Sequence, residues 1–283
     1  MDQPDPRGQF LSLDGRRMHV VPAGPPGDQP LVLLEAGSFG FSADWAVVQE
    51  QLAVRGLRSL AYDRAGMGLS DPGPSPRDGL AIARDLERLL AAAGEDGRVV
   101  LVGHSMAGLH AHLFAGRNRG RIAGLVLVDA IDPAMATDRR VVRGAAHYRR
   151  FARAVAGAAA VGLLKPLRRW GDTIGLDGAA QAHKRWAVAE ARHNRAAAEE
   201  VVHWEAAVSQ ALAVGPLDPA WPVAVVTAGA AKPGAWLKAL RAVSANGPVD
   251  HVAGANHASL LGRGFADRIV AAIEQVLKAP GRK

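Results

Sequence analysis

Cysteine is absent from the 283 residues of this chain, which excludes disulfide bonds and thiolate metal sites. Long hydrophobic runs are absent as well. The longest, Ala154–Leu164, covers eleven residues between Arg153 and Lys165 and is too short to cross a bilayer. The first residues, Met1–Gln9, are polar and lack the apolar core of a secretory signal. We therefore expect a cytoplasmic protein without stable membrane insertion.

Aromatic and acidic residues are also scarce. Only 14 of the 283 residues are aromatic, and 27 acidic residues face 34 basic ones, which gives a formal charge of +7. A basic balance indicates nucleic-acid binding when the cations form a stripe beside stacking aromatics. Here the basic residues are scattered singly and in pairs. The sequence therefore predicts no nucleic-acid partner, although it leaves anionic substrates or surfaces open.

Short β-rich runs alternate with helical stretches along most of the chain. This alternation predicts the α/β fold class, with a mostly parallel central sheet and helices on both faces. The expected strands are Phe10–Leu13 and Arg17–Val21, which form a hairpin, then Leu31–Leu34, Arg58–Tyr62, Val99–Val102, Ile122–Val128, Val223–Ala228 and Val249–Val252. The expected helices are Asp44–Arg55, 77–93, Ser105–Gly116, Trp236–Ser244 and Phe265–Leu277, with Asp44 as the first residue of its helix.

The alternation stops between residues 132 and 215. This stretch is rich in alanine and arginine, contains no strand-like run, and carries 13 basic against 8 acidic residues. We interpret it as an inserted helical cap. The predicted organisation is therefore a core formed by residues 1–131 and 216–283, with a cap formed by residues 132–215.

A candidate nucleophile follows the expected strand Val99–Val102, where residues 103–108 read Gly-His-Ser-Met-Ala-Gly. A serine hydroxyl is a poor nucleophile near neutral pH unless a base lies beside it and a tight turn exposes it. Gly-x-Ser-x-Gly between a strand and a helix supplies such a turn, called a nucleophile elbow. Gly103 fits this pattern, whereas Ala107 replaces the second glycine, which is delayed to Gly108. We predict that Ser105 is a nucleophile.

Two further motifs accompany this serine. Residues 63–71 read Asp-Arg-Ala-Gly-Met-Gly-Leu-Ser-Asp, and Asn256-His257 lies near the end of the chain. With these three ordered motifs, the sequence resembles the capped α/β-hydrolases, a group that includes esterases, lactonases, C–C bond hydrolases, haloalkane dehalogenases and epoxide hydrolases. The dehalogenases and epoxide hydrolases use an aspartate nucleophile, so Ser105 argues against both activities. The resemblance implies no cofactor. A metal pair at His110 and His112 is not expected either, because the two residues lie on different faces of their helix.

The resemblance also implies a catalytic histidine and a catalytic acid. Relatives take the histidine from the loop after the last strand, which is the position of His257. Many take the acid from the strand after the cap, but no aspartate or glutamate occurs from Pro219 to Val249. A subset takes it from the strand before the cap, where Asp129 follows Ile122–Val128. We therefore predict a Ser105-His257-Asp129 triad, with Asp132 and then Asp250 as the alternative acids.

Acyl transfer also needs donors for the oxyanion. The resemblance implies the backbone N–H groups of Met106, after the nucleophile, and of Ser38, where residues 35–40 read Glu-Ala-Gly-Ser-Phe-Gly. Phe39 and Phe41 are expected at the pocket floor, and the cap aromatics Trp186 and Trp204 are expected to contact substrate.

The predicted reaction is hydrolysis of a carboxylic ester or lactone of a moderately hydrophobic small molecule, as in carboxylesterases and lactonases, through an acyl-serine intermediate. Three alternatives stay open. The same triad serves C–C bond hydrolases and cofactor-free haloperoxidases, and a hydrolase scaffold can also serve as a non-catalytic ligand-binding protein.

Overall fold

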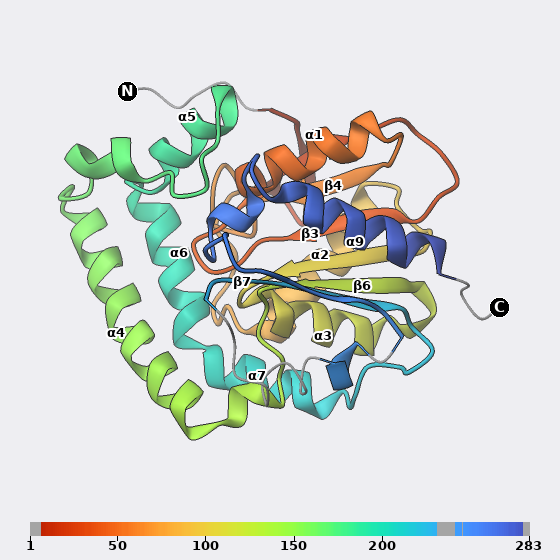
Figure 1. Cartoon of the computed structure of the whole chain (residues 1–283). Helices are drawn as coiled ribbons and strands as arrows, with labels where there is room; N and C mark the ends of the chain where they lie inside the picture. The colour runs from red at the N-terminus through yellow and green to blue at the C-terminus, as the bar shows by residue number, and fades with distance from the viewer. Residues whose placement is uncertain (1–6, 231–240, 245, 280–283) are drawn as a thin grey trace.

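An eight-stranded sheet forms the centre of the computed structural model, which describes residues 7–230, 241–244 and 246–279 (Figure 1). The strand order within the described part of the chain is β1-β2-β4-β3-β5-β6-β7-β8. The strands are β1 (Gln9–Leu13), β2 (Arg16–Ala23), β3 (Leu31–Glu35), β4 (Ser59–Tyr62), β5 (Val99–His104), β6 (Ile122–Val128), β7 (Val223–Ala228) and β8 (Val249–Val252). All eight coincide with the strands expected from the sequence to within a few residues.

Most of the sheet is parallel, as predicted. The six strands from β3 to β8 are parallel to one another, whereas β2 pairs antiparallel with both β1 and β4. Asp14 and Gly15 join β1 to β2 with φ angles of 51° and 79°. Two left-handed residues in a two-residue turn match the twist of a β-hairpin, which confirms the expected hairpin.

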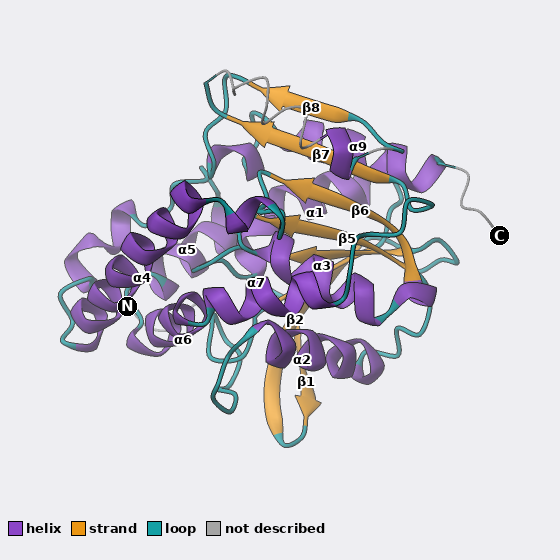
Figure 2. Cartoon of the chain, turned by 90° about the horizontal axis from the view of Figure 1, so that it is seen from below, coloured by secondary structure: helices purple, strands orange, loops and turns teal. Residues whose placement is uncertain are grey.

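Helices cover both faces of the sheet (Figures 1 and 2). Helices α1 (Ala46–Val54) and α9 (Ala266–Lys278) pack together on one face, and α2 (Gly79–Ala92) and α3 (Ala107–Arg117) pack together on the other. Side chains alternate along each buried strand, so Val100 and Val102 join the core on the α1 side while Val99 and Leu101 join the core on the α2 side. A sheet covered on both faces needs apolar residues at every strand position. This is why unbroken apolar runs located the strands.

The helix predicted to begin at Asp44 begins later. Asp44 lies in the 3-10 turn η1 (Ser42–Trp45), and α1 starts at Ala46 without a side-chain cap. The carboxylate of Asp44 instead accepts hydrogen bonds from Lys184, 140 residues away in the sequence. The predicted helix Trp236–Ser244 lies largely outside the described residues.

Residues 132–215 are helical in the described structure, and they connect β6 to β7. They contain the 3-10 turns η3 (Met135–Thr137) and η4 (Lys165–Trp170) and the helices α4 (Arg139–Ala160), α5 (Gly178–Ala187), α6 (Ala191–Val202) and α7 (Trp204–Ala213). Helix α4 packs on α6, α5 packs near η1, and α7 packs on α2 and α3. We call this segment the helical insertion. It lies on the side toward which the arrows of the parallel strands point (Figure 2).

The apolar run Ala154–Leu164 lies within this insertion. It spans the end of α4 and the residues that follow. The burial of its side chains changes along its length, because Ala159 is buried whereas Val161 and Leu163 are exposed. No helix in the described part of the chain combines the length and the apolar character needed to cross a membrane.

Candidate active site

Ser105 occupies a strained turn between β5 and α3. Its φ angle is 58°, in the left-handed region that residues other than glycine rarely adopt. Its backbone N–H donates to the carbonyl of Val128, and its own carbonyl accepts from Gly108 and Ile131. These bonds hold the turn in place, and Ser105 lies next to the N-terminal end of α3, where the helix dipole favours negative charge.

Two glycines allow the chain to pass close to this turn. A Cβ atom added to Gly37 would lie 2.8 Å from the Cβ of Ser105, and one added to Gly108 would lie 2.3 Å from the carbonyl oxygen of Ile131. Ala107 has no such clash and is fully buried. The altered elbow of the sequence is therefore explained: the glycine required by close backbone approach is at position 108.

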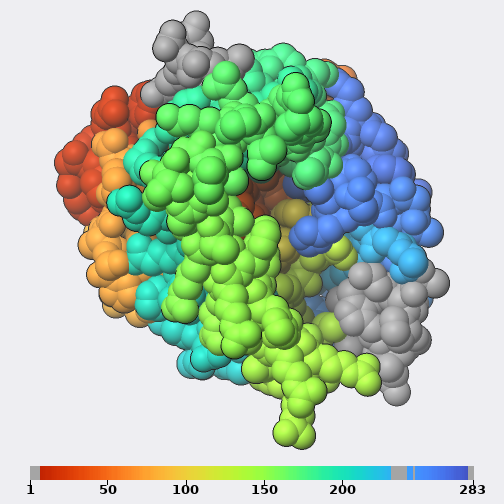
Figure 3. Space-filling model, turned by 90° about the vertical axis from the view of Figure 1, so that its left-hand side faces the viewer, coloured from red at the N-terminus to blue at the C-terminus, as the bar shows by residue number. Residues whose placement is uncertain are grey.

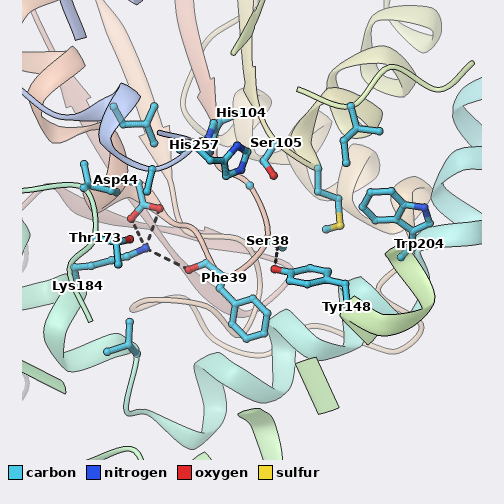
Figure 4. A pocket seen from close by; sticks show the side chains of 18 of the residues that line it. Ser38, Phe39, Asp44, His104, Ser105, Tyr148, Thr173, Lys184, Trp204 and His257 are labelled. Atoms are coloured by element: carbon cyan, nitrogen blue, oxygen red, sulfur yellow. Dashed lines mark hydrogen bonds and ion pairs between the residues drawn. The ribbon is translucent and has the colours of Figure 1, made fainter. Parts of the chain in front are cut away.

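His257 and Asp129 are joined by a short hydrogen bond. The Nδ1 of His257 lies 2.6 Å from Oδ2 of Asp129. Asp129 follows β6 with a φ angle of 42°, and His257 follows β8, so both lie at the carboxyl edge of the sheet, as Ser105 does. The side chains of Ser105 and His257 line the same cavity (Figure 4). The structure thus brings together the three residues selected from the sequence.

His104 supports the backbone that carries His257. Its Nε2 lies 3.0 Å from the carbonyl oxygen of His257, and the two rings lie 4.5 Å apart. Since a carbonyl can only accept, Nε2 of His104 carries the proton. Burial, and then the adjacent His257, lower the pKa of His104 to about 3. A neutral histidine therefore holds this loop, a role that the sequence did not reveal.

The two alternative acids have other partners. Asp132 accepts hydrogen bonds from the backbone N–H groups of Ala134 and Met135. Asp250 forms a two-bonded ion pair with Arg268 of α9. Neither carboxylate lines the cavity that contains Ser105.

The loop after β3 passes close to Ser105 at Gly37. Within the described residues, the N–H groups of Ser38 and Met106 donate to no protein acceptor. The carbonyl of Gly37 accepts from Nη2 of Arg64 at 2.8 Å. Because the C=O of Gly37 and the N–H of Ser38 belong to one planar trans peptide, they point in opposite directions. The N–H of Gly40 donates to the same carbonyl at 3.1 Å. Arg64 and Gly40 therefore fix the direction of the Ser38 N–H together.

Arg64 is the centre of a buried charge cluster. Its guanidinium lies 2.7 Å from Glu35, at the end of β3, and 2.9 Å from Glu200, on α6, with all three side chains almost fully buried. Burial alone would lower the pKa of Arg64, but Glu200 and Glu35 raise it above the ordinary value. Burial would likewise raise the pKa of Glu35, but Arg64 and His110 bring it below the ordinary value. Arg64 and Glu35 are therefore ionised, and the cluster joins the β3 loop to the helical insertion.

The cavity beside Ser105 has a volume of about 610 Å³ and lies between the core and the insertion. Phe39 and Trp204 line it, as expected from the sequence. The expectations for Trp186 and Phe41 are wrong. Trp186 packs against the core cluster on the α1 side, and Phe41 is almost completely buried in that cluster.

A second charged pair lines this cavity. Nζ of Lys184, on α5, lies 2.7 and 2.9 Å from the two carboxylate oxygens of Asp44 and 3.4 Å from the carbonyl oxygen of Phe39 (Figure 4). Burial raises the pKa of Asp44 above its ordinary value, in spite of the neighbouring lysine. Phe39 has a φ angle of 57°, so the lysine bonds a strained residue of the β3 loop.

A hydroxyl pair closes the same loop from the insertion side. Oγ of Ser38 lies 2.7 Å from the phenolic oxygen of Tyr148, on α4 (Figure 4). No local pattern in the sequence indicated a role for Tyr148 or Lys184, and Arg64 stood out only as a member of the motif at residues 63–71. The hydroxyl and charged side-chain partners of these three residues are 29 to 140 residues away in the sequence. In the described part of the chain, no group of three or more His, Asp and Glu side chains is arranged to hold a metal ion.

Comparisons with known proteins agree on one fold. A family profile described as "alpha/beta hydrolase fold" matches residues 30–169. A curated "Putative carbamate hydrolase RutD" of Variovorax paradoxus is 39% identical over 109 residues, which is 37% of this chain and 40% of that protein. The first curated relatives are matched over only 15 to 40% of their own length.

Two solved structures extend the likeness to nearly the whole chain. The epoxide hydrolase CorEH has a TM-score of 0.72 at 23% identity and covers 94% of this chain and 97% of its own. An esterase from Thermogutta terrifontis has a TM-score of 0.71 at 21% identity and covers 98% of this chain and all of its own. At these identities the likeness establishes the fold, whereas the chemistry has to be argued from the side chains.

Proposed function

Because the chain belongs to the α/β-hydrolase superfamily, we propose that it is a serine hydrolase that cleaves a carboxylic ester or lactone with Ser105, His257 and Asp129 as its triad. One observation carries the proposal. Ser105, in a strained turn, shares a cavity with His257, and Nδ1 of His257 lies 2.6 Å from Oδ2 of Asp129. Nucleophilic serine chemistry requires this order of groups.

The first half of the proposed reaction forms an acyl-serine. Nε2 of His257 takes the proton from Oγ of Ser105 as Oγ attacks the substrate carbonyl carbon. Asp129 accepts a hydrogen bond from Nδ1–H, which leaves Nε2 free to act as the base and stabilises the imidazolium that forms. When the tetrahedral intermediate collapses, the bond to the leaving oxygen breaks and His257 gives its proton to that oxygen.

The second half reverses these steps with water. His257 takes a proton from water as the water oxygen attacks the acyl carbon, and the proton then returns to Oγ of Ser105 as the acid leaves. In both halves, negative charge develops on the former carbonyl oxygen. The N–H groups of Ser38 and Met106 are the donors we assign to it, and one such donor contributes about 3–4 kcal/mol of transition-state stabilisation.

The cavity supports a small and partly hydrophobic substrate. Its lining includes Phe39, Met106 and Trp204, and the charged Lys184–Asp44 pair also borders it. A volume near 610 Å³ lies in the usual range of small-molecule sites. We assign residues 132–215 as the cap of this site, because Tyr148 and Lys184 reach the cavity from that segment.

The proposal is tested with p-nitrophenyl esters of graded acyl length and a panel of lactones. The wild-type protein is expected to hydrolyse at least one series, and Ser105→Ala is expected to lower kcat by about 10⁴-fold or more. A fluorophosphonate probe is expected to label Ser105 and not Ser105→Ala. The matched control is Ser12→Ala, an exposed serine on β1 that should change neither measurement.

Two outcomes would replace the proposal. Absence of both turnover and labelling would favour a non-catalytic binding protein on a hydrolase scaffold. Labelling of Ser105 without turnover of any ester or lactone would favour the other serine-triad activities, C–C bond hydrolysis and cofactor-free haloperoxidation.

A further inference from the structure

The end of α4 and the turn after it expose an unusual number of apolar side chains. Nine large hydrophobic side chains are exposed in the described part of the chain, and four of them lie within residues 161–170. Their exposed fractions are 73% for Val161, 65% for Leu163, 52% for Leu167 and 58% for Trp170. We call residues 161–170 the η4 tip. Such a contiguous exposed patch marks an interaction surface.

The η4 tip and α4 also carry one sign of charge. From residue 139 to 171 the sequence contains no aspartate or glutamate, and it contains nine basic residues, more than the whole excess of +7. These are Arg139, Arg140, Arg143, Arg149, Arg150, Arg153, Lys165, Arg168 and Arg169. In the described structure, Arg149 pairs with Glu205, and no other member of this group forms an ion pair.

The patch borders the mouth of the active-site cavity. Gly171 and Thr173, directly after the tip, line that cavity, and Gly144 and Tyr148 line it from α4. Figure 3 shows the insertion in green, facing the viewer, with a hollow between it and the blue C-terminal part of the chain. A flat partner bound at the tip would therefore lie beside the opening.

From these observations we propose that the η4 tip docks the protein on the surface of an anionic lipid bilayer. Apolar side chains with adjacent cations are what an interfacial segment needs, because the apolar groups enter the acyl boundary while the cations meet the headgroups. Trp170 fits the headgroup level, with the guanidinium of Arg169 3.8 Å from its ring centroid. Docking in this orientation brings the cavity mouth to substrates dissolved in the bilayer.

Other partners fit the same surface less well. A nucleic acid would pair with the cations, but the aliphatic side chains of Val161, Leu163 and Leu167 would gain nothing from its phosphate backbone. A second copy of the chain, docked tip to tip, would place nine cations against nine, with no carboxylate from the same segments between them. The anionic bilayer satisfies both the apolar and the charged groups.

The test is co-sedimentation of the full chain with vesicles of phosphatidylcholine alone and with 30% phosphatidylglycerol. We expect binding that requires phosphatidylglycerol and weakens steeply between low and high salt.

Because one basic side chain near such a surface strengthens binding by roughly fivefold, Lys165→Glu with Arg169→Glu should weaken vesicle binding by more than tenfold. Leu163→Ser with Trp170→Ser should weaken it as well. Ester hydrolysis in vesicle-free solution should stay unchanged in both variants, and this readout separates failure of docking from failure of the proposed chemistry.

Matched controls use exposed residues outside the insertion. Val54→Ser, on α1, removes a side chain that is 83% exposed, and Arg84→Glu with Lys278→Glu reverses two exposed charges on α2 and α9. All three changes should leave vesicle binding within about twofold of wild type. The proposal is overturned if vesicles do not bind, if the controls weaken binding as much as the tip variants, or if duplex DNA binds while Leu163→Ser with Trp170→Ser has no effect. Concentration-dependent dimerisation that the tip variants abolish would also overturn it.

Discussion

Arg64, on the loop after β4, forms a buried ion pair with Glu200, on helix α6, with N–O distances of 2.9 to 3.0 Å. Nη1 and Nη2 of the same guanidinium donate to the carbonyl groups of Ala36 and Gly37, respectively. One side chain therefore joins the helical insertion to the loop that presents the Ser38 N–H. The position of the insertion and the geometry of the proposed oxyanion hole are coupled through Arg64, which is a positioning residue.

Arg64→Lys is expected to reduce kcat by about 10- to 100-fold while changing KM by much less. A lysine keeps the charge but cannot donate in a fixed plane to two carboxylates and two carbonyls. The Ser38 N–H then loses its fixed direction, and misaligned donors cost transition-state binding rather than ground-state binding. Steady-state kinetics on an ester substrate provide the measurement.

The matched control for this change is Arg77→Lys. Arg77 is equally buried and pairs with Asp85, but its side chain donates no hydrogen bond to the loop after β3. If the two variants lose the same stability and both keep wild-type kcat, Arg64 has only a structural role.

Asp129→Asn is expected to lower kcat by about 10⁴-fold, because the amide cannot keep Nδ1 of His257 protonated and oriented. Asp132→Asn and Asp250→Asn are expected to change kcat by less than threefold. Asp132→Asn keeps an Oδ1 that accepts from the N–H groups of Ala134 and Met135, so its unfolding free energy should stay within about 0.5 kcal/mol of wild type. Asp250→Asn should lose up to about 1 kcal/mol, because its ion pair with Arg268 is removed. Kinetics and urea unfolding of the three variants distinguish the acids, and a large kcat loss in Asp132→Asn would reassign the triad.

Gly108→Ala tests the altered elbow. The new Cβ would meet the backbone of Ile131, so we expect a loss of about 1–3 kcal/mol of unfolding free energy and a lower kcat, since Ile131 is two residues from Asp129. The control, Gly157→Ala in α4, has no heavy atom within 4 Å of the added Cβ. It should stabilise the protein by about 0.5–1 kcal/mol. Equal effects of the two changes would contradict the close-approach explanation.

The elbow also illustrates what the sequence can and cannot predict. The strands could be predicted because a strand buried on both faces is an unbroken apolar run. Ser105 could be proposed as the nucleophile because the motif around it is local in the sequence. Asp129 could be proposed as the acid because the stretch from Pro219 to Val249 contains no aspartate or glutamate. These features need no knowledge of distant contacts.

Long-range pairs account for what the sequence did not predict. Asp44 has the local signature of a helix start, but Lys184 takes its carboxylate, and α1 begins two residues later. Trp186 was expected to contact substrate only because it is an aromatic residue of the segment 132–215, yet it packs on the core. The role of Arg64 depends on Glu200, 136 residues away. Such pairings are set by how the insertion docks, which no local pattern encodes.

His193 makes stability depend on pH. It lies on α6, where its Nδ1 accepts from the N–H of Gly68, and burial, followed by the charge of Lys184, lowers its pKa to about 3. The unfolded value is near 6.5, so between pH 6.5 and 3 the unfolded state binds a proton that the folded state does not. Stability is therefore present above pH 6.5 and is lost as the pH falls, by up to about 1.4 kcal/mol per pH unit for this group.

His193→Gln is expected to remove this dependence. Urea unfolding at pH 8, 7, 6 and 5 should show the wild-type protein losing stability on acidification faster than the variant. Above pH 7 the difference in unfolding free energy between the two proteins should no longer change with pH. His147→Gln, at an exposed histidine of the same insertion, is the comparison variant. Parallel curves for the wild type and His193→Gln would show that His193 titrates normally in the folded state.

Lys184→Met is expected to destabilise the protein by about 3–5 kcal/mol, because it leaves the buried carboxylate of Asp44 without its cation. The pKa of Asp44 is already raised by burial, and removing the lysine would raise it further. The folded state then holds a proton that the unfolded state has lost, so the penalty should be larger at pH 8 than at pH 5.

Adding Asp44→Leu should recover most of the lost stability, since an apolar pair can replace a buried ion pair at little cost. Lys278→Met, at an exposed lysine of α9, should stay within about 0.5 kcal/mol of wild type. Urea unfolding of the wild type, Lys184→Met, Asp44→Leu and the double variant gives the coupling energy. A coupling near zero would mean that Lys184 and Asp44 contribute independently of each other.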